Sequence, residues 1–174
     1  MSHAAEQGPQ QAPEISSVHV LSLDELENDI VRTGVSYWRA LRGGRSFPPR
    51  SPLSPRDMAG VLRNIVLVRI IDGGRDYEFR IVGDAHVQGY GIDFNRMRNS
   101  DIERIAPEHG AQMRVLYEHV RNTGQPLAFR GWVGREVKDA LFVYHESAFL
   151  PLGETGDTVD HILVVSIYVP KVQS

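Results

Sequence analysis

The sequence contains no cysteine, which excludes thiolate chemistry. The histidines and the arginines are the residues considered for binding or chemistry. A zinc site on a helix needs two histidines four residues apart, and no pair in the chain has that spacing. The motif Asp84-x-His86 is too short to specify a metal, so we expect no metal site and interpret His86 as buried and hydrogen-bonded. The seven histidines are His3, His19, His86, His109, His119, His145 and His161.

The arginines gather between Arg39 and Arg63, where six of them stand against a single acidic residue, Asp57. Such a patch would bind phosphate, a nucleotide or an acidic partner through charge-assisted hydrogen bonds. Basic runs are more often solvated surface, so both interpretations stay open. The candidate patch comprises Arg39, Arg42, Arg45 and Arg50.

Motifs of enzymes are absent from the sequence, and we expect no catalytic residue. There is no G-x-S-x-G elbow, and the glycines at 89 and 91 lack the further glycine of a dinucleotide site. A net charge of -3 argues against nucleic-acid binding, and so does the lack of the interleaved aromatic pattern of a single-strand platform among the arginines. No apolar run approaches the roughly 20 residues that span a bilayer, and no secretory signal is evident. We therefore expect a cytoplasmic protein without membrane insertion.

The clearest element that must position these residues is a helix at 107–123. Pro107 suits its first turn, Gly124 can adopt the left-handed cap, and Pro126 prevents continuation. Alternation of apolar and polar residues over 127–133 then predicts a strand. One apolar stripe follows from the spacing of Met113, Leu116, Tyr117 and Val120.

Four further strands and several short helices complete the expected domain. Strands at 65–71 and 77–81 flank the turn Asp72-Gly73-Gly74, and strands at 141–150 and 162–169 flank a polar loop. A short helix after Asp84 carries His86 and Tyr90, and helical pieces follow over 93–106. The order predicts an α+β fold, with a five-stranded antiparallel sheet and helices on one face.

An amphipathic helix precedes the sheet. The capping box Ser22-x-x-Glu25 predicts its start, and Gly43-Gly44 its end. Gly34 inside it indicates a close neighbour or a kink. Whether the helix dimerises or packs on its own domain stays open. We thus divide the chain into a disordered tail (1–20), this helix with a proline-rich connector (21–63), and the sheet domain (64–174). The expected apolar face comprises Leu23, Leu26, Ile30, Tyr37 and Leu41.

Several motifs in this order resemble the PAS family of sensory domains over roughly residues 65–170. They are FRIVGD at 79–84, GYG at 89–91, PEH at 107–109, VRNTGQPL at 120–127 and AFLPL at 148–152. The leading YWRALRG at 37–43 and the FPPR-x-x-L-S-P connector resemble a bacterial subgroup in which a PAS domain forms nearly the whole protein. The resemblance implies a sheet that cups a pocket under the helices, used for ligand sensing or protein–protein contact, often in dimers.

Within that pocket we expect a particular lining, although close packing could instead leave no cavity at all. The expected lining comprises His86, Tyr90, Met113, Tyr117, Phe129 and Tyr144.

The cofactors of the family can be tested against the residues. Flavin photoreceptors form a flavin–thiol adduct and coumaroyl photoreceptors need a thioester, so the absence of cysteine excludes both. Haem-binding members place an axial histidine on the long helix. That position falls on Met113 here, with His109 one turn earlier and His119 toward the edge. A methionine packed in the core is the simpler interpretation, so we expect neither haem nor another cofactor.

These observations favour a non-catalytic PAS module of bacterial signalling that senses a small molecule or docks onto signalling proteins. We expect a homodimer through the N-terminal helix, and partners such as histidine kinases or response regulators. One alternative is a small enzyme on a cone-like α+β fold, which would bring a histidine and an acid together in a closed pocket. Another is a nucleotide-messenger binder that uses the patch Arg39–Arg50.

Overall fold

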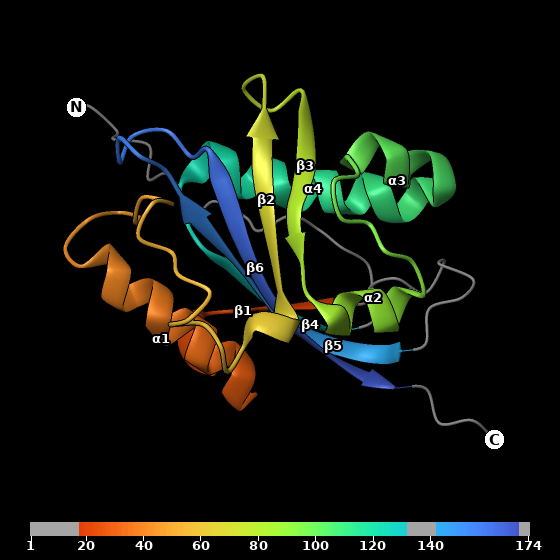
Figure 1. Cartoon of the computed structure of the whole chain (residues 1–174), viewed down its shortest axis with the longest axis horizontal. Coiled ribbons are helices and arrows are strands. Elements are labelled where there is room, and N and C mark those ends of the chain that lie inside the picture. Colours follow the sequence, from red (N-terminus) through yellow and green to blue (C-terminus); the bar gives the residue numbers. More distant parts are fainter. Residues whose placement is uncertain (1–17, 132–141, 171–174) are drawn as a thin grey trace, which may run out of the picture.

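The computed structural model describes residues 18–131 and 142–170. At its centre is an antiparallel sheet of six strands in the order β1-β4-β5-β6-β2-β3 (Figure 1). The predicted α+β class and antiparallel sheet are confirmed, with one strand more than expected. The strands are β1 (Val18–Leu21), β2 (Ile65–Ile71), β3 (Asp76–Val82), β4 (Leu127–Gly131), β5 (Phe142–Leu152) and β6 (His161–Pro170).

The additional strand is β1, which forms one edge of the sheet. It pairs with β4, with Leu21 opposite Ala128 and Val18 opposite Gly131. The disordered tail predicted up to residue 20 was therefore wrong for residues 18–20. Four residues are too few to show a strand pattern, and it is the pairing with a distant segment that orders them. Residues 1–17 lie outside the described part of the chain.

The helices end and begin largely at the expected glycines and prolines. Pro107 occupies the first turn of α4, and Gly124 closes that helix with φ 64°, its N–H bonded to the carbonyl of Val120. None of the described helices has the length and apolarity that a transmembrane span requires. The helices are α1 (Asp29–Arg42), α2 (Asp84–Tyr90), α3 (Asn99–Ile105) and α4 (Pro107–Thr123), with 3₁₀ turns η1 (Leu23–Glu25) and η2 (Leu62–Asn64).

Helices cover both faces of the sheet, with α1 on one face and α4 on the other (Figure 1). Val165 lies against Gly34 of α1, so close that a Cβ added to the glycine would be 2.7 Å from Val165 Cγ2. Val164 points to the opposite face and lines a cavity beneath α2 and α4. The close neighbour predicted for Gly34 is thus a sheet side chain, and α1 packs on its own domain.

The start and buried face of α1 differ from the sequence prediction. Ser22 N–H donates to Glu25 Oε1 at 3.1 Å, but this pair caps only η1. The helix itself begins after Asn28, whose Oδ1 accepts from the N–H groups of Ile30 and Val31. The residues buried against the sheet are Val31, Gly34, Val35 and Trp38.

Trp38 anchors the layer formed by α1. Its side chain is fully buried, and its indole Nε1–H donates to the carbonyl of Pro151 at 2.8 Å. Phe47 and Met58 of the following connector are also buried, so this segment completes the same core.

Candidate ligand-binding site

A cavity lies between the sheet and helices α2, α3 and α4. Its volume is about 80 Å³, several times the roughly 10–15 Å³ that one water molecule needs. Aromatic rings form much of its wall. Tyr117 of α4 stacks on Phe149 of β5 at a centroid distance of 5.6 Å, and Phe129 of β4 lies 5.3 Å from Phe149. The lining is therefore mainly apolar and suited to a flat molecule.

His86 lines one end of the cavity and is hydrogen-bonded through both ring nitrogens. Nε2 lies 3.0 Å from the carbonyl oxygen of Asn64, which can only accept, so Nε2 carries the proton. Nδ1 then accepts from the hydroxyl of Tyr168, which is itself bonded to Tyr90. Burial lowers the pKa of His86 to about 4, so its ring is neutral at pH 7. The prediction of a buried, hydrogen-bonded His86 is confirmed.

Two other residues of the lining each carry a buried polar atom without a hydrogen-bond partner among the described residues. The atoms are Nδ1 of His109 and Oδ1 of Asn99. The two residues are 6% and 0% exposed. Burial lowers the pKa of His109 to about 4, which keeps it neutral at pH 7. Leaving a buried polar atom unbonded costs about 1–3 kcal/mol, so these atoms mark a place where a bound molecule would be stabilised.

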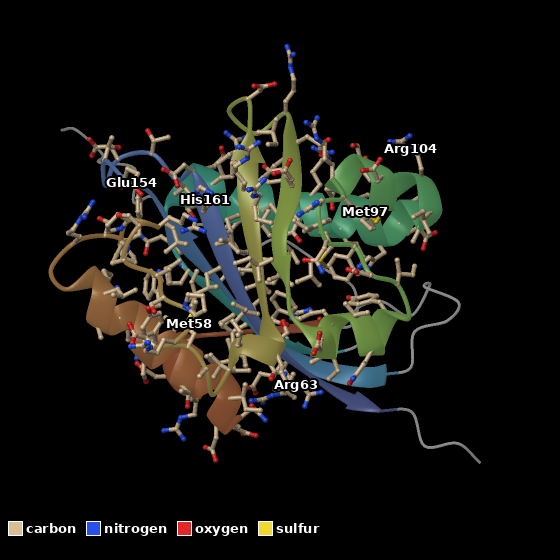
Figure 2. All side chains as sticks on the ribbon, in the orientation of Figure 1. Met58, Arg63, Met97, Arg104, Glu154 and His161 are labelled. Atoms are coloured by element: carbon tan, nitrogen blue, oxygen red, sulfur yellow. The ribbon has the colours of Figure 1, made fainter. Side chains whose placement is uncertain are left out.

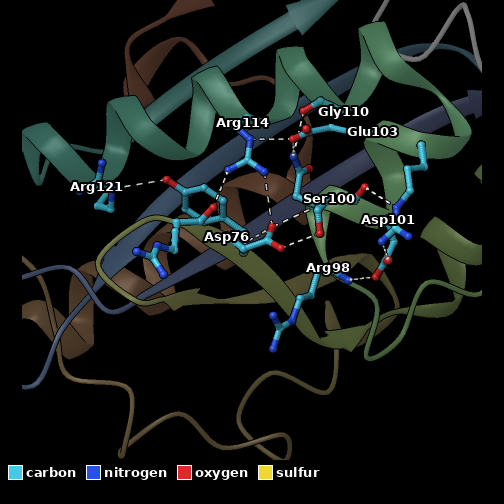
Figure 3. A network of polar contacts seen from close by, with 12 residues as sticks. Asp76, Arg98, Ser100, Asp101, Glu103, Gly110, Arg114 and Arg121 are labelled. Carbon is cyan, nitrogen blue, oxygen red and sulfur yellow. Dashed lines mark hydrogen bonds and ion pairs between the residues drawn. The ribbon is translucent and has the colours of Figure 1, made fainter.

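The orientation of Asn99 is set by a polar network across the α3–α4 hairpin, part of which Figure 3 shows. Asn99 Nδ2 donates to Glu103 Oε1 at 2.7 Å and to the carbonyl of Gly110 at 3.0 Å. Both of these oxygens accept, so the amide nitrogen must face them and the amide oxygen is the unbonded atom. Arg114 Nε holds Glu103 Oε1 at 2.6 Å, and Arg114 also reaches toward Asp76 of β3.

Comparison with known proteins agrees with this geometry. A family model described as a PAS domain matches residues 29–166, from the start of α1 into β6. The chain belongs to the PAS family. Members of this family are generally sensory or signalling modules. None of the curated proteins compared matches the chain.

Five of the six residues expected to line the pocket of the PAS domain do line the cavity. His86 and Tyr90 come from α2, Met113 and Tyr117 from α4, and Phe129 from β4. Tyr144 lies in β5, but its side chain is outside the described part of the chain. The alternative of a core filled without a cavity is not what the structure shows, whereas ligand binding by these residues stays a prediction.

The positions considered for a haem ligand can now be compared with the space around them. Met113 and His109 both line the cavity, whereas His119 is not part of the described lining. The expectation that the protein binds no haem stays a prediction. In residues 18–131 and 142–170, no three histidine or acidic side chains cluster as metal ligands would.

The arginines of the candidate patch make separate contacts with three different segments. Arg39 pairs with Asp24 at 3.2 Å, and the guanidinium of Arg42 lies 4.9 Å from the centre of its own helix's Trp38 ring. Arg45 donates to the carbonyl oxygen of Glu154 in the β5–β6 loop. Phosphate binding by this patch stays a prediction.

Sequence reasoning missed several polar residues of the cavity. Ser166 and Tyr168 alternate along β6 with residues of the opposite face such as Val165, and this period of two, continued from Val164, could have placed them on the cavity face. Asn99 gave no such signal, because it stands at the start of a short helix whose position depends on a tertiary contact with Gly110 of α4.

Proposed function

We propose that this PAS domain is a non-catalytic sensor that binds a small molecule in the cavity between the sheet and helices α2–α4. The observation that carries the proposal is the combination of a preformed, mainly apolar cavity with two buried polar atoms that lack a partner in the described chain. A ligand with different affinities for two arrangements of these helices would shift the population between them. That shift would alter the surface offered to signalling proteins.

The alternative of an enzyme on a cone-like fold required a histidine and an acid to meet in a closed pocket. The described lining contains His86 and His109 but no aspartate or glutamate. This described lining offers no carboxylate to orient a histidine for acid–base chemistry.

Partners such as histidine kinases or response regulators remain part of the proposal, as does a homodimer. The apolar face of α1 is already buried on its own sheet, and its exposed side carries polar residues such as Arg32, Ser36 and Arg39. A dimer through α1 would therefore use this polar side.

The test is a thermal-shift screen of small molecules against three proteins. Val164→Phe places a large ring in the cavity, and Val115→Phe makes the same change on the exposed side of α4, where Val115 is 45% exposed. A ligand at 100 times its Kd stabilises the native state by about 2.7 kcal/mol. We expect hits that stabilise the wild type and Val115→Phe but not Val164→Phe. Hits that act equally on all three proteins, or no hit at all, would favour a module that only docks onto other proteins.

A further inference from the structure

The charge of the cavity restricts what it can hold. The described lining includes no aspartate, glutamate, lysine or arginine, and both of its histidines are neutral at pH 7. Arg104 of α3 projects away from the sheet (Figure 2), and its side chain is 75% exposed. An ion moved from water into such a site would lose its hydration without gaining a counter-charge. The described part of the lining therefore favours an uncharged occupant.

The unbonded polar atoms define what the occupant must offer. The amide nitrogen of Asn99 donates to Glu103 and Gly110, so the unbonded atom is the amide oxygen Oδ1. An amide oxygen can only accept a hydrogen bond. A ligand that satisfies it needs an O–H or N–H group. His109 Nδ1 is an acceptor in one neutral tautomer and a donor in the other, and a hydroxyl group can bond to it in either case.

His86 does not add a further demand of this kind. Both of its nitrogens are bonded within the protein, to Asn64 and Tyr168. The unbonded polar atoms thus come from Asn99 of α3 and His109 of α4, while the lining also includes aromatic rings such as those of Tyr117 and Phe149.

We propose that the cavity selects a small, uncharged aromatic molecule that directs a hydroxyl or N–H group at Asn99 and His109. This inference rests on the proposed function, and it narrows that function to one chemical class. Carboxylates, phosphorylated nucleotides and amines that are charged at pH 7 fall outside the class, because the described lining has no side chain to balance their charge.

The experiment compares four probes of similar size at pH 7: phenol, toluene, benzoate and benzylammonium. Binding to the full chain is measured by ligand-observed NMR and calorimetry. We expect phenol to bind, toluene to bind more weakly, and the two ions to show no binding. Tighter binding of benzoate or benzylammonium than of phenol would overturn the inference and leave the proposed function in place.

Two matched variants locate the hydrogen bond. His109→Phe keeps the ring and its contact with Tyr90 but removes both nitrogens, and His119→Phe makes the same change on α4 outside the described lining. The preference for phenol over toluene is expressed as a ratio of Kd values, so that the different hydrophobicity of the probes cancels between proteins. We expect this ratio to fall about tenfold in His109→Phe, the factor that one hydrogen bond contributes, and to stay unchanged in His119→Phe.

Two further outcomes separate the inference from the function on which it rests. An unchanged ratio in His109→Phe would overturn the inference, although binding itself would support a ligand site. Failure of all four probes to bind would also overturn it, because a cavity of the proposed class accepts the phenol ring. The proposed function would then still be decided by the Val164→Phe and Val115→Phe screen.

Discussion

The two histidines of the cavity have the same charge state but opposite roles in the hydrogen bonding of the protein. His86 is bonded at both nitrogens, so its ring is fixed by Asn64 and Tyr168. His109 is packed 5.3 Å from the ring of Tyr90, and its Nδ1 has no partner in the described chain. The first stabilises the native site, whereas the second leaves a hydrogen bond for a ligand to make.

Their shared low pKa makes the stability of the protein depend on pH. In the unfolded chain a histidine has a pKa of about 6.5, whereas burial lowers the pKa of both to about 4 in the fold. Below pH 6.5 the unfolded state binds protons that the folded state does not, so stability is full above this pH and falls as the pH drops toward 4. We expect each histidine to remove on the order of 1–2 kcal/mol from the free energy of unfolding between pH 7 and pH 5.

Urea unfolding at pH 7 and pH 5 measures this difference. His109→Phe removes one of the two groups, so it should reduce the loss between the two pH values by about half. His86→Phe should reduce it similarly, although it also removes the hydrogen bond between His86 and Tyr168 and so lowers stability at both pH values. The same loss in His109→Phe as in the wild type would contradict a neutral, buried His109.

For single residues, the sequence predicted burial better than it predicted hydrogen-bond partners. His86 was expected to be buried and hydrogen-bonded because the motif Asp84-x-His86 is too short to specify a metal, and the structure shows His86 buried and hydrogen-bonded. The acceptor for its Nε2, the carbonyl of Asn64, lies 22 residues away, and no side-chain pattern reports on a backbone carbonyl.

Among the elements, α1 illustrates how a tertiary contact decides where a helix begins. Glu146 of β5 is 2% exposed, and its Oε1 accepts from the backbone N–H groups of Glu27 and Asn28 at 3.1 and 2.9 Å. Arg130 of β4 holds the other carboxylate oxygen at 2.8 Å. A buried negative charge thus sits at the N-terminus of α1, where the helix dipole favours it.

Removing that charge should loosen the attachment of α1 to the sheet. Glu146→Gln keeps an oxygen that can accept from Asn28 but leaves Arg130 without its buried counter-charge. We expect the free energy of unfolding to fall by about 3 kcal/mol, measured by urea denaturation at pH 7. Glu154→Gln, the same change at an exposed position of the β5–β6 loop, should alter it by less than about 0.5 kcal/mol. Equal effects of the two substitutions would show that Glu146 is not a stabilising cap.

The same tertiary contact with Glu146 explains why the observed start of α1 differs from the predicted one. Ser22 and Glu25 form a local capping box that the sequence shows, yet the helix that follows needs Glu146, which is 118 residues from Asn28. Local signals were sufficient for α4, because Pro107 and Gly124 act on the backbone of their own helix. The close neighbour of Gly34 was predicted, but the identity of that neighbour, Val165, required the sheet.

On the scale of the whole molecule, the question is whether residues 64–174 form a unit without α1, as the domain division from the sequence supposes. Trp38 is fully buried and bonded to Pro151, and Gly34 packs on Val165. The family match also begins at residue 29, with α1. The sheet has apolar residues on both faces, a pattern that requires cover on each side.

We therefore expect the fragment 64–174 to fail to fold on its own. Loss of a buried tryptophan alone typically costs about 3–5 kcal/mol, which is comparable to the whole stability of many domains, and the fragment also loses the cover of Leu163 and Val165. The measurement is a ¹H–¹⁵N NMR spectrum with a thermal melt, compared with a chain that begins at residue 18 and keeps β1 and α1. The longer chain should show dispersed signals and one cooperative transition, and the fragment should show neither. A dispersed spectrum from the fragment would mean that the sheet with α2–α4 is a domain by itself and that α1 is an attachment to it.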